Sequence, residues 1–176
     1  MRKANYDKFP STKLTGMLVQ GWDSIISMLK EKMDARKVLA VDLYTGVYEE
    51  EVLGAFSKEF SGRVMNVRDL MKRFMTEDVL FGYVTNLKLE DYLDADKVAA
   101  ARKQISEAKE TIVIIGTGAA VVAPQDAMVV YADMARWEIQ QRFRRHEVKA
   151  LGIDNRNDAV SLQYKRGYFN DWRVCD

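Results

Sequence analysis

The chain has 176 residues, which suits a single domain with a well-buried core. Lys and Arg total 27 and Asp and Glu total 26, so the net charge is +1 and no overall field attracts nucleic acid or an anionic membrane. The one cysteine, Cys175, excludes an internal disulfide framework and fits a reducing compartment. No apolar run approaches the roughly 20 residues that cross a bilayer, and the start lacks an apolar signal segment. We therefore expect a cytoplasmic protein that binds neither nucleic acid nor membrane.

Short apolar runs alternate with amphipathic stretches along the chain. In chain order, the patterns predict a helix at 22–35, a strand at 37–43, a helix at 48–60, a strand at 62–67, a helix at 94–110, strands at 111–118 and 127–134, and a helix at 135–151. The helix at 135–151 is basic and offers Trp137, Ile139 and Phe143 for packing. This order predicts a three-layer α/β/α fold with a mostly parallel sheet covered on both faces. Ligands of such sheets bind beyond the carboxyl ends of the strands, so the residues there are the candidate site.

The turn after the first strand has the layout of a phosphate-binding loop. The stretch VLAVDLYTGVYEEEV (38–52) places Asp42, Tyr44 and Gly46 between a strand and a helix. A Walker-type loop needs several glycines, a Lys and a Ser or Thr, and this turn keeps one glycine without the Lys-Ser/Thr pair. The glutamates at 49–51 stabilise the helix through its dipole and would repel a triphosphate. The turn is therefore either a helix start optimised for stability or an unusual ligand site.

Three later strand ends carry further candidates. Asp69 follows the second strand, where it would act as a general base in a kinase or cap the next helix. Gly116 and Gly118 follow the third strand as an incomplete G-x-G-x-x-G, which favours a tight turn at the rim of a pocket. Arg136 and Arg142, after the fourth strand, would clamp a phosphate or belong to a solvated basic face.

The carboxyl-terminal stretch QYKRGYFNDWRVCD (163–176) mixes aromatic and basic residues. Such mixing stacks nucleobases in some proteins, but the low net charge favours core packing or docking of further chain. His146 is the only histidine, so a zinc site of His and Cys ligands and a Ser-His or Cys-His nucleophile are both unexpected. We expect no metal or cofactor in this segment.

Several stretches together resemble one family. These are NYDKFPSTKL, VLAVDLYTGVYEEEVL, DVLFGYVTNLKLEDYLD, VIIGTGAA, YADMARWEIQQRFRR and YKRGYFNDWRVCD. They are similar to the amino-terminal domain of class I mannose-6-phosphate isomerase-like proteins of Bacteroidetes, which in turn resembles P-loop nucleoside or uridine kinases. The resemblance implies a kinase-like domain over residues 1–176 with a degenerate Walker A loop, followed in a longer chain by a cupin domain. Zinc is implied only for that cupin part. The stretch around Met71, Lys72 and Arg73 is shorter than the resemblance leads us to expect.

The resemblance implies an accessory or regulatory domain in sugar-phosphate metabolism that binds a phosphorylated or nucleotide-like ligand without turnover. Its ligand residues would be Asp42, Tyr44, Gly46, Gly116, Gly118, Arg136 and Arg142. Two alternatives stay open. One is an active nucleoside or sugar kinase with Asp69 as base and an arginine in place of the missing Lys. The other is a purely structural domain that mediates assembly. The cupin domain in cis is an expected partner, and a homo-oligomer is left open.

Overall fold

The fold is α/β with a four-stranded, all-parallel sheet, as the sequence predicts. A computed structural model describes residues 11–13, 15–33, 35, 37–60, 63–72 and 85–176. The strands are β1 (Val38–Leu43), β2 (Arg63–Asn66), β3 (Ile112–Gly116) and β4 (Met128–Ala132), in the spatial order β2-β3-β1-β4. The stretch around Met71, Lys72 and Arg73, which the resemblance predicts to be longer, continues into residues 73–84, and these lie outside the described residues.

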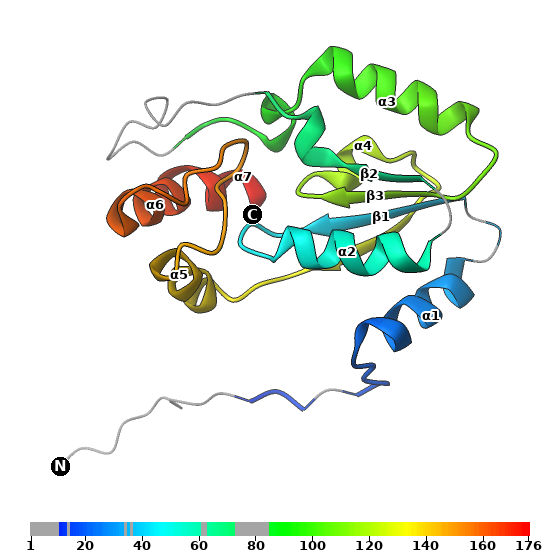
Figure 1. Ribbon diagram of the computed structural model, residues 1–176, viewed down its shortest axis with the longest axis horizontal. Coiled ribbons are helices and arrows are strands. Elements are labelled where there is room, and N and C mark those ends of the chain that lie inside the picture. Colours follow the sequence, from blue (N-terminus) through cyan, green and yellow to red (C-terminus); the bar gives the residue numbers. More distant parts are fainter. Residues whose placement is uncertain (1–10, 14, 34, 36, 61–62, 73–84) are drawn as a thin grey trace.

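Helices cover both faces of the sheet and also its carboxyl end. The helices are α1 (Trp22–Met33), α2 (Glu49–Glu59), α3 (Ala95–Glu107), α4 (Ala119–Val122), α5 (Arg136–Arg144), α6 (Val160–Arg166) and α7 (Trp172–Cys175), with a π-helix, η4 (Gly167–Asp171), between the last two. The sheet lies between α1 and α2 on one side and α3 and α4 on the other, while α5, α6 and α7 gather beyond the strand ends (Figure 1). No described helix combines the length and the apolar character needed to cross a membrane.

The strands alternate side chains between two separate cores. Leu39 and Val41 of β1 pack with α1 and α2, whereas Ala40 packs with α3 and α4. Because the side-chain period of a strand is two, a continuous apolar run serves both faces. The central strand β3 is fully buried along its length, which is why IVIIG contains no polar side chain.

The topology creates a crevice between two neighbouring strands. The chain leaves β1 through α2 on one face and leaves β3 through α4 on the other, although β1 and β3 pair directly. Loops that depart to opposite faces open a switch point at the carboxyl ends of these strands. The loops at this point are residues 44–48 and 116–118.

Helix α5 closes over the loop that follows β1. Gly46 has a φ of +90°, and a Cβ built on it would lie 2.7 Å from Cγ1 of Ile139 on α5. The absent side chain at Gly46 therefore sets how closely α5 approaches. Of the three apolar α5 residues expected to pack, Ile139 and Phe143 are buried, but Trp137 is 69% exposed, so that part of the expectation was wrong. The helix also ends earlier than predicted, because His146 has a φ of +56° and turns the chain away.

The carboxyl-terminal stretch packs inward around a buried ion pair. Arg166 and Asp171 are both almost fully buried, with Arg166 Nε 3.4 Å from Asp171 Oδ1. Arg166 also donates to the Leu151 carbonyl, and Asp171 accepts the Leu151 N–H. Burial raises the pKa of Asp171. These contacts join the α6–α7 segment to the loop that follows α5. Of the aromatic residues in this tail, Trp172 is buried, whereas Tyr164 and Tyr168 are exposed.

We predict that Gly46→Ala lowers the free energy of unfolding by about 2–4 kcal/mol, because it adds left-handed strain and a clash with Ile139. The matched control is Gly54→Ala within α2, where a Cβ meets nothing within 4 Å and φ is not positive. The control should be more stable than the wild type by roughly 0.5–1 kcal/mol. Urea unfolding followed by circular dichroism measures both. Equal effects of the two substitutions would contradict the close approach of α5.

We predict that Arg166→Met costs about 3–5 kcal/mol of stability near neutral pH, because Asp171 is left buried without its counterion. The folded-state pKa of Asp171 is raised, so its favourable contribution is present below the unfolded pKa of about 3.9 and is lost as the pH rises. The loss in Arg166→Met should therefore be smaller near about pH 4 than near neutrality. Thermal unfolding at both pH values checks this, and the double variant Arg166→Met/Asp171→Leu should recover much of the loss. A loss that does not change with pH would show that Asp171 is not the affected group.

Candidate functional site

The candidate site is the strand-end pocket, which we define as the small cavity between the loops 44–48 and 116–118. Residues 43–50 form one wall, and the other wall includes Arg68, Thr117 and residues 147–149. The cavity has a volume of about 30 Å³. That space holds about one water molecule, far less than the roughly 300 Å³ or more of ordinary ligand pockets. The strand-end pocket is therefore nearly filled.

Asp42 binds two backbone amide groups of the segment that follows β3. Its Oδ1 accepts a hydrogen bond of 2.9 Å from the Gly118 N–H, and its Oδ2 accepts one of 2.8 Å from the Ala120 N–H. The carboxylate thus spans from the end of β1 to the first turn of α4. Charged hydrogen bonds of this kind are stronger than neutral ones. The Asp42 carboxylate therefore joins the end of β1 to the turn before α4 at the switch point.

The strand-end glycines are explained by conformation and packing. Gly116 has a φ of +134°, and a Cβ there would lie 2.9 Å from the Cβ of Val67. Gly118 has a φ of +90° and faces Leu89. The tight turn expected after β3 is confirmed. Together with Gly46, these residues let the backbone turn sharply where three loops meet.

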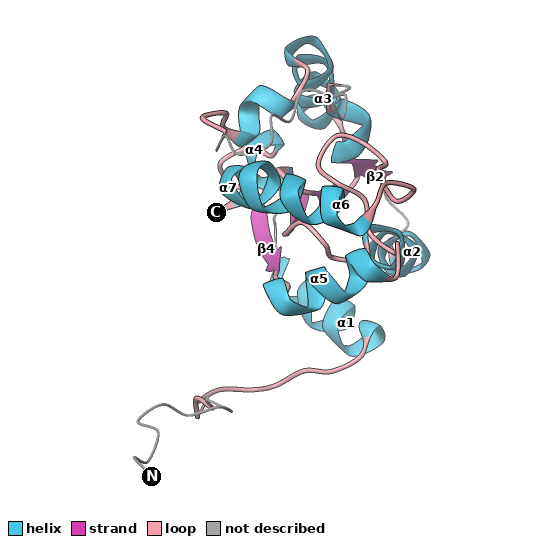
Figure 2. Cartoon of the chain, turned by 90° about the vertical axis from the view of Figure 1, so that its left-hand side faces the viewer, coloured by secondary structure: helices cyan, strands magenta, loops and turns pink. Residues whose placement is uncertain are grey.

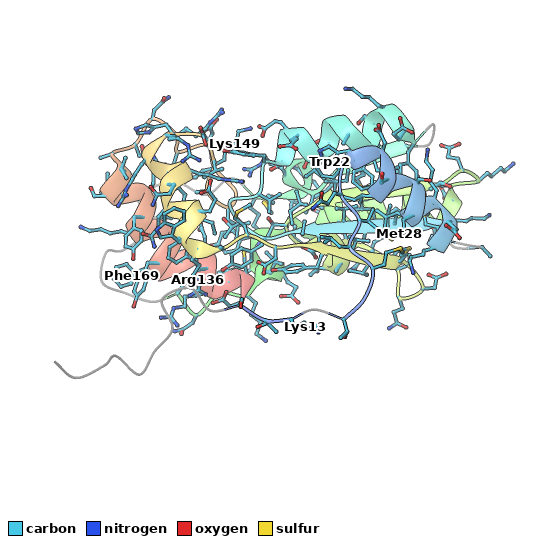
Figure 3. All side chains as sticks on the ribbon, turned by 90° about the horizontal axis from the view of Figure 1, so that it is seen from below. Lys13, Trp22, Met28, Arg136, Lys149 and Phe169 are labelled. Atoms are coloured by element: carbon cyan, nitrogen blue, oxygen red, sulfur yellow. The ribbon has the colours of Figure 1, made fainter. Side chains whose placement is uncertain are left out.

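Tyr44 and Arg136 meet at the carboxylate of Asp176. The Tyr44 hydroxyl donates to Asp176 Oδ1 at 2.8 Å, and Arg136 forms an ion pair with the same carboxylate. The Arg136 guanidinium also lies over the Trp172 ring, 5.4 Å from its centroid. Burial, aided by Asp176, raises the pKa of Tyr44 to about 12, so the hydroxyl stays a donor at neutral pH. Arg136 lies at the end of the molecule where α5–α7 gather (Figure 3).

The Arg142 side chain binds the loop after β1. Its Nη1 donates to the Gly46 carbonyl at 2.7 Å, and its guanidinium lies 3.6 Å from the centroid of the Tyr48 ring. Its Nε pairs with Glu138 at 3.3 Å. The side chain is nearly buried, so it is not part of a solvated basic face. The two arginines predicted to clamp phosphate therefore contact different groups, Arg142 the loop and Arg136 the carboxyl-terminal helix.

Each glutamate in the first turn of α2 has a partner from another element. Glu49 accepts from Arg68 Nε at 2.8 Å, Glu50 pairs with Lys149, and Glu51 accepts from the Trp22 indole at 2.9 Å. The hydrogen bond from Lys149 lowers the pKa of Glu50, which favours the ionised form of this carboxylate. The helix start is therefore stabilised by partners as well as by its dipole.

Sequence reasoning missed Arg68, Glu147 and Lys149, which line the strand-end pocket. Glu147 accepts a hydrogen bond of 2.5 Å from the Tyr48 hydroxyl. The available signal was weak: a basic residue follows β2, and a Glu-Val-Lys run follows α5. Nothing local connects either run to the turn after β1.

Asp69 lies apart from the strand-end pocket. It belongs to a short 3-10 helix, η1 (Val67–Leu70), and lines a separate cavity with Lys97 of α3. The prediction that Asp69 caps the next helix was wrong. The side chain of Asn66 accepts the Arg68 N–H at the start of η1, and Asp94 caps α3. Asn66 and Asp94 precede their helices, which is where a cap must lie, whereas Asp69 lies inside its turn.

The described residues contain no cluster of three or more His, Cys, Asp or Glu side chains that would hold a metal ion. Cys175 packs near Tyr44 and Trp172 at the strand ends, and burial raises the pKa of its thiol. A thiol in this state is protonated at neutral pH and a poor nucleophile. A cavity of about 520 Å³, lined by Lys37 and Arg102 among others, lies at the opposite, amino end of the sheet.

Comparison with known proteins gives one match. A family model described as "Domain of unknown function (DUF8485)" matches residues 21–176. No curated protein and no solved structure matches the chain. The match covers every described helix and strand from α1 to α7. The chain therefore belongs to the DUF8485 family.

Proposed function

We propose that the chain is a non-catalytic accessory domain of a sugar-phosphate isomerase-type protein. The observation that carries the proposal is the Asp42 carboxylate on the N–H groups of Gly118 and Ala120, with both hydrogen bonds shorter than 3 Å. A nucleotide cradle uses such N–H groups for phosphate. Here they already serve an anion that belongs to the chain. The isomerase context rests on the sequence resemblance.

Phosphoryl transfer fits this site poorly on electrostatic grounds. A triphosphate near α2 would meet Asp42 and the glutamates at 49–51 without the Lys and Ser or Thr that hold phosphate and magnesium. Arg136 and Arg142, the available substitutes for that Lys, are paired with Asp176 and with the loop after β1. Asp69, the candidate base, lines a different cavity. A kinase mechanism would need all of these contacts to break.

Binding of a phosphorylated ligand is the second candidate, and one observation favours it. Lys149 and Arg68 both line the strand-end pocket, and both form ion pairs with carboxylates there. Phosphate accepts the same charged hydrogen bonds as a carboxylate. A sugar phosphate that displaced Glu50 from Lys149 would widen the pocket without the need for a Walker loop.

We predict that the wild-type chain transfers no phosphoryl group from ATP with magnesium to nucleosides or hexoses. Asp69→Asn should give the same background rate, because Asp69 lies outside the pocket. A coupled assay of ADP release measures both proteins. A wild-type rate above background that Asp69→Asn abolishes would overturn the non-catalytic proposal in favour of a kinase.

Isothermal titration separates the remaining two roles. We expect no heat from ATP with magnesium, because the carboxylates of the pocket repel it. Heat from a hexose phosphate that disappears in Lys149→Met and persists in Lys58→Met would establish ligand binding at the pocket. Lys58 is a suitable control because it lies in the last turn of α2, at the other end of the helix from Glu50. No heat from any ligand would leave the structural role as the function.

A further inference from the structure

One edge of the sheet carries apolar side chains that no described element covers. Strand β4 is the last in the order β2-β3-β1-β4, so only β1 pairs with it in the described part of the chain. Val129 and Tyr131 are 54% and 56% exposed. They lie on the face that α3 and α4 cover elsewhere, because Val129 is in register with Ala40. The four-residue helix α4 does not bury them.

The same two residues present the free backbone of the edge. The Tyr44 N–H donates to the Ala132 carbonyl, so the peptide groups of Ala132 face β1. In a strand these groups alternate sides with each residue, so the N–H and C=O groups of Tyr131 and Val129 face outward. Strand β4, MVVYA, contains no charged residue and no proline, either of which would discourage pairing. The edge is therefore suited to receive another strand.

A second uncovered segment lies at the other end of the chain. Before α1, residues 15–20 form an extended arm, TGMLVQ, in which Met17 is 80% exposed and Leu18 is 76% exposed. The arm carries no charge and no proline. It leaves α1 toward the side of the molecule on which β4 forms the sheet edge and stands clear of the body (Figure 2). A β-prone apolar segment without cover is a partner for a free edge.

We propose that the arm of one copy, residues 15–20, pairs with the β4 edge of a second copy, and that the exchange is reciprocal. The arm is about as long as the five-residue strand β4, so one added strand would satisfy the outward groups of Val129 and Tyr131. In this structure the arm has no cover and the β4 edge has no partner strand among the described residues. Two copies related by a twofold axis would pair each arm with the edge of the other copy. The proposal does not depend on the strand-end pocket or on its ligand.

Light scattering of the full 176-residue chain after size exclusion tests the assembly. We expect twice the 20.2 kDa mass of one chain at high concentration. Val129→Pro removes one outward N–H and spares the bonds to β1, and Met17→Ser/Leu18→Ser removes the apolar arm without touching the folded body. Each should weaken self-association roughly tenfold or more, since each removes backbone or apolar contacts of the added strand. Tyr168→Ser, an exposed aromatic residue of η4, is the control and should have no effect.

Cross-linking distinguishes the second copy from the chain's own arm. In a Cys175→Ser background, a tagged Leu18→Cys chain is mixed with a differently tagged Val129→Cys chain and oxidised, with Met17→Cys run in parallel because its side chain faces the other way. We expect a disulfide-linked product that carries both tags. An internally linked monomer in the double variant Leu18→Cys/Val129→Cys, with no mixed product, would overturn the exchange in favour of closure within one chain. A monomer at all concentrations, or a dimer that neither the arm nor the edge variant weakens, would also overturn it.

Discussion

The contact between Gly46 and Ile139 determines how closely the carboxyl-terminal helices α5–α7 approach the sheet. Because residue 46 has no Cβ, α5 comes close enough for Arg142 to donate to the Gly46 carbonyl and to stack on Tyr48. The position of α5 then places the loop that carries Lys149 beside the start of α2. A glycine that resembles part of a phosphate loop therefore serves here to seat a helix. The sheet and the carboxyl-terminal helices are joined at the place where related architectures bind ligands.

At the strand ends, carboxylates of the chain itself bind the backbone amides and basic side chains that lie there. The amides at the start of α4 receive Asp42, and the basic side chains Arg68 and Lys149 receive glutamates from α2. The Arg68–Glu49 pair is partly screened from water, so it is worth more than an open surface pair, whereas the Glu50 side chain that pairs with Lys149 is mostly exposed. A ligand at this site has to compete with groups held nearby by the fold itself, which sets a high threshold for binding. The same contacts join β1 to the start of α4, and join α2 to η1 and to the loop after α5.

The fold was predictable because its signals are local. The apolar runs of β1 and β3 and the stripe of Val52, Phe56 and Phe60 determine strand or helix from neighbouring residues alone. The site was less predictable, because its partners lie far apart along the chain: 132 residues separate Tyr44 from Asp176, and 99 separate Glu50 from Lys149. The residue types at the strand ends were visible, but which charge meets which is decided by the packing of α5 and α7. Trp137 illustrates the limit, since helical spacing did not reveal that it faces solvent.

The partly buried thiol of Cys175 makes the carboxyl-terminal helix observable. Because burial raises the pKa of this thiol, a thiol-specific reagent should react with it slowly in the folded chain and faster when α7 moves away from the strand ends. The rate of modification then reports how often α7 moves. The measurement needs no engineered probe, since the chain has one cysteine. A molecule that weakens the contacts of α7 with Tyr44 and Arg136 would raise the modification rate of Cys175, and a molecule that strengthens these contacts would lower it.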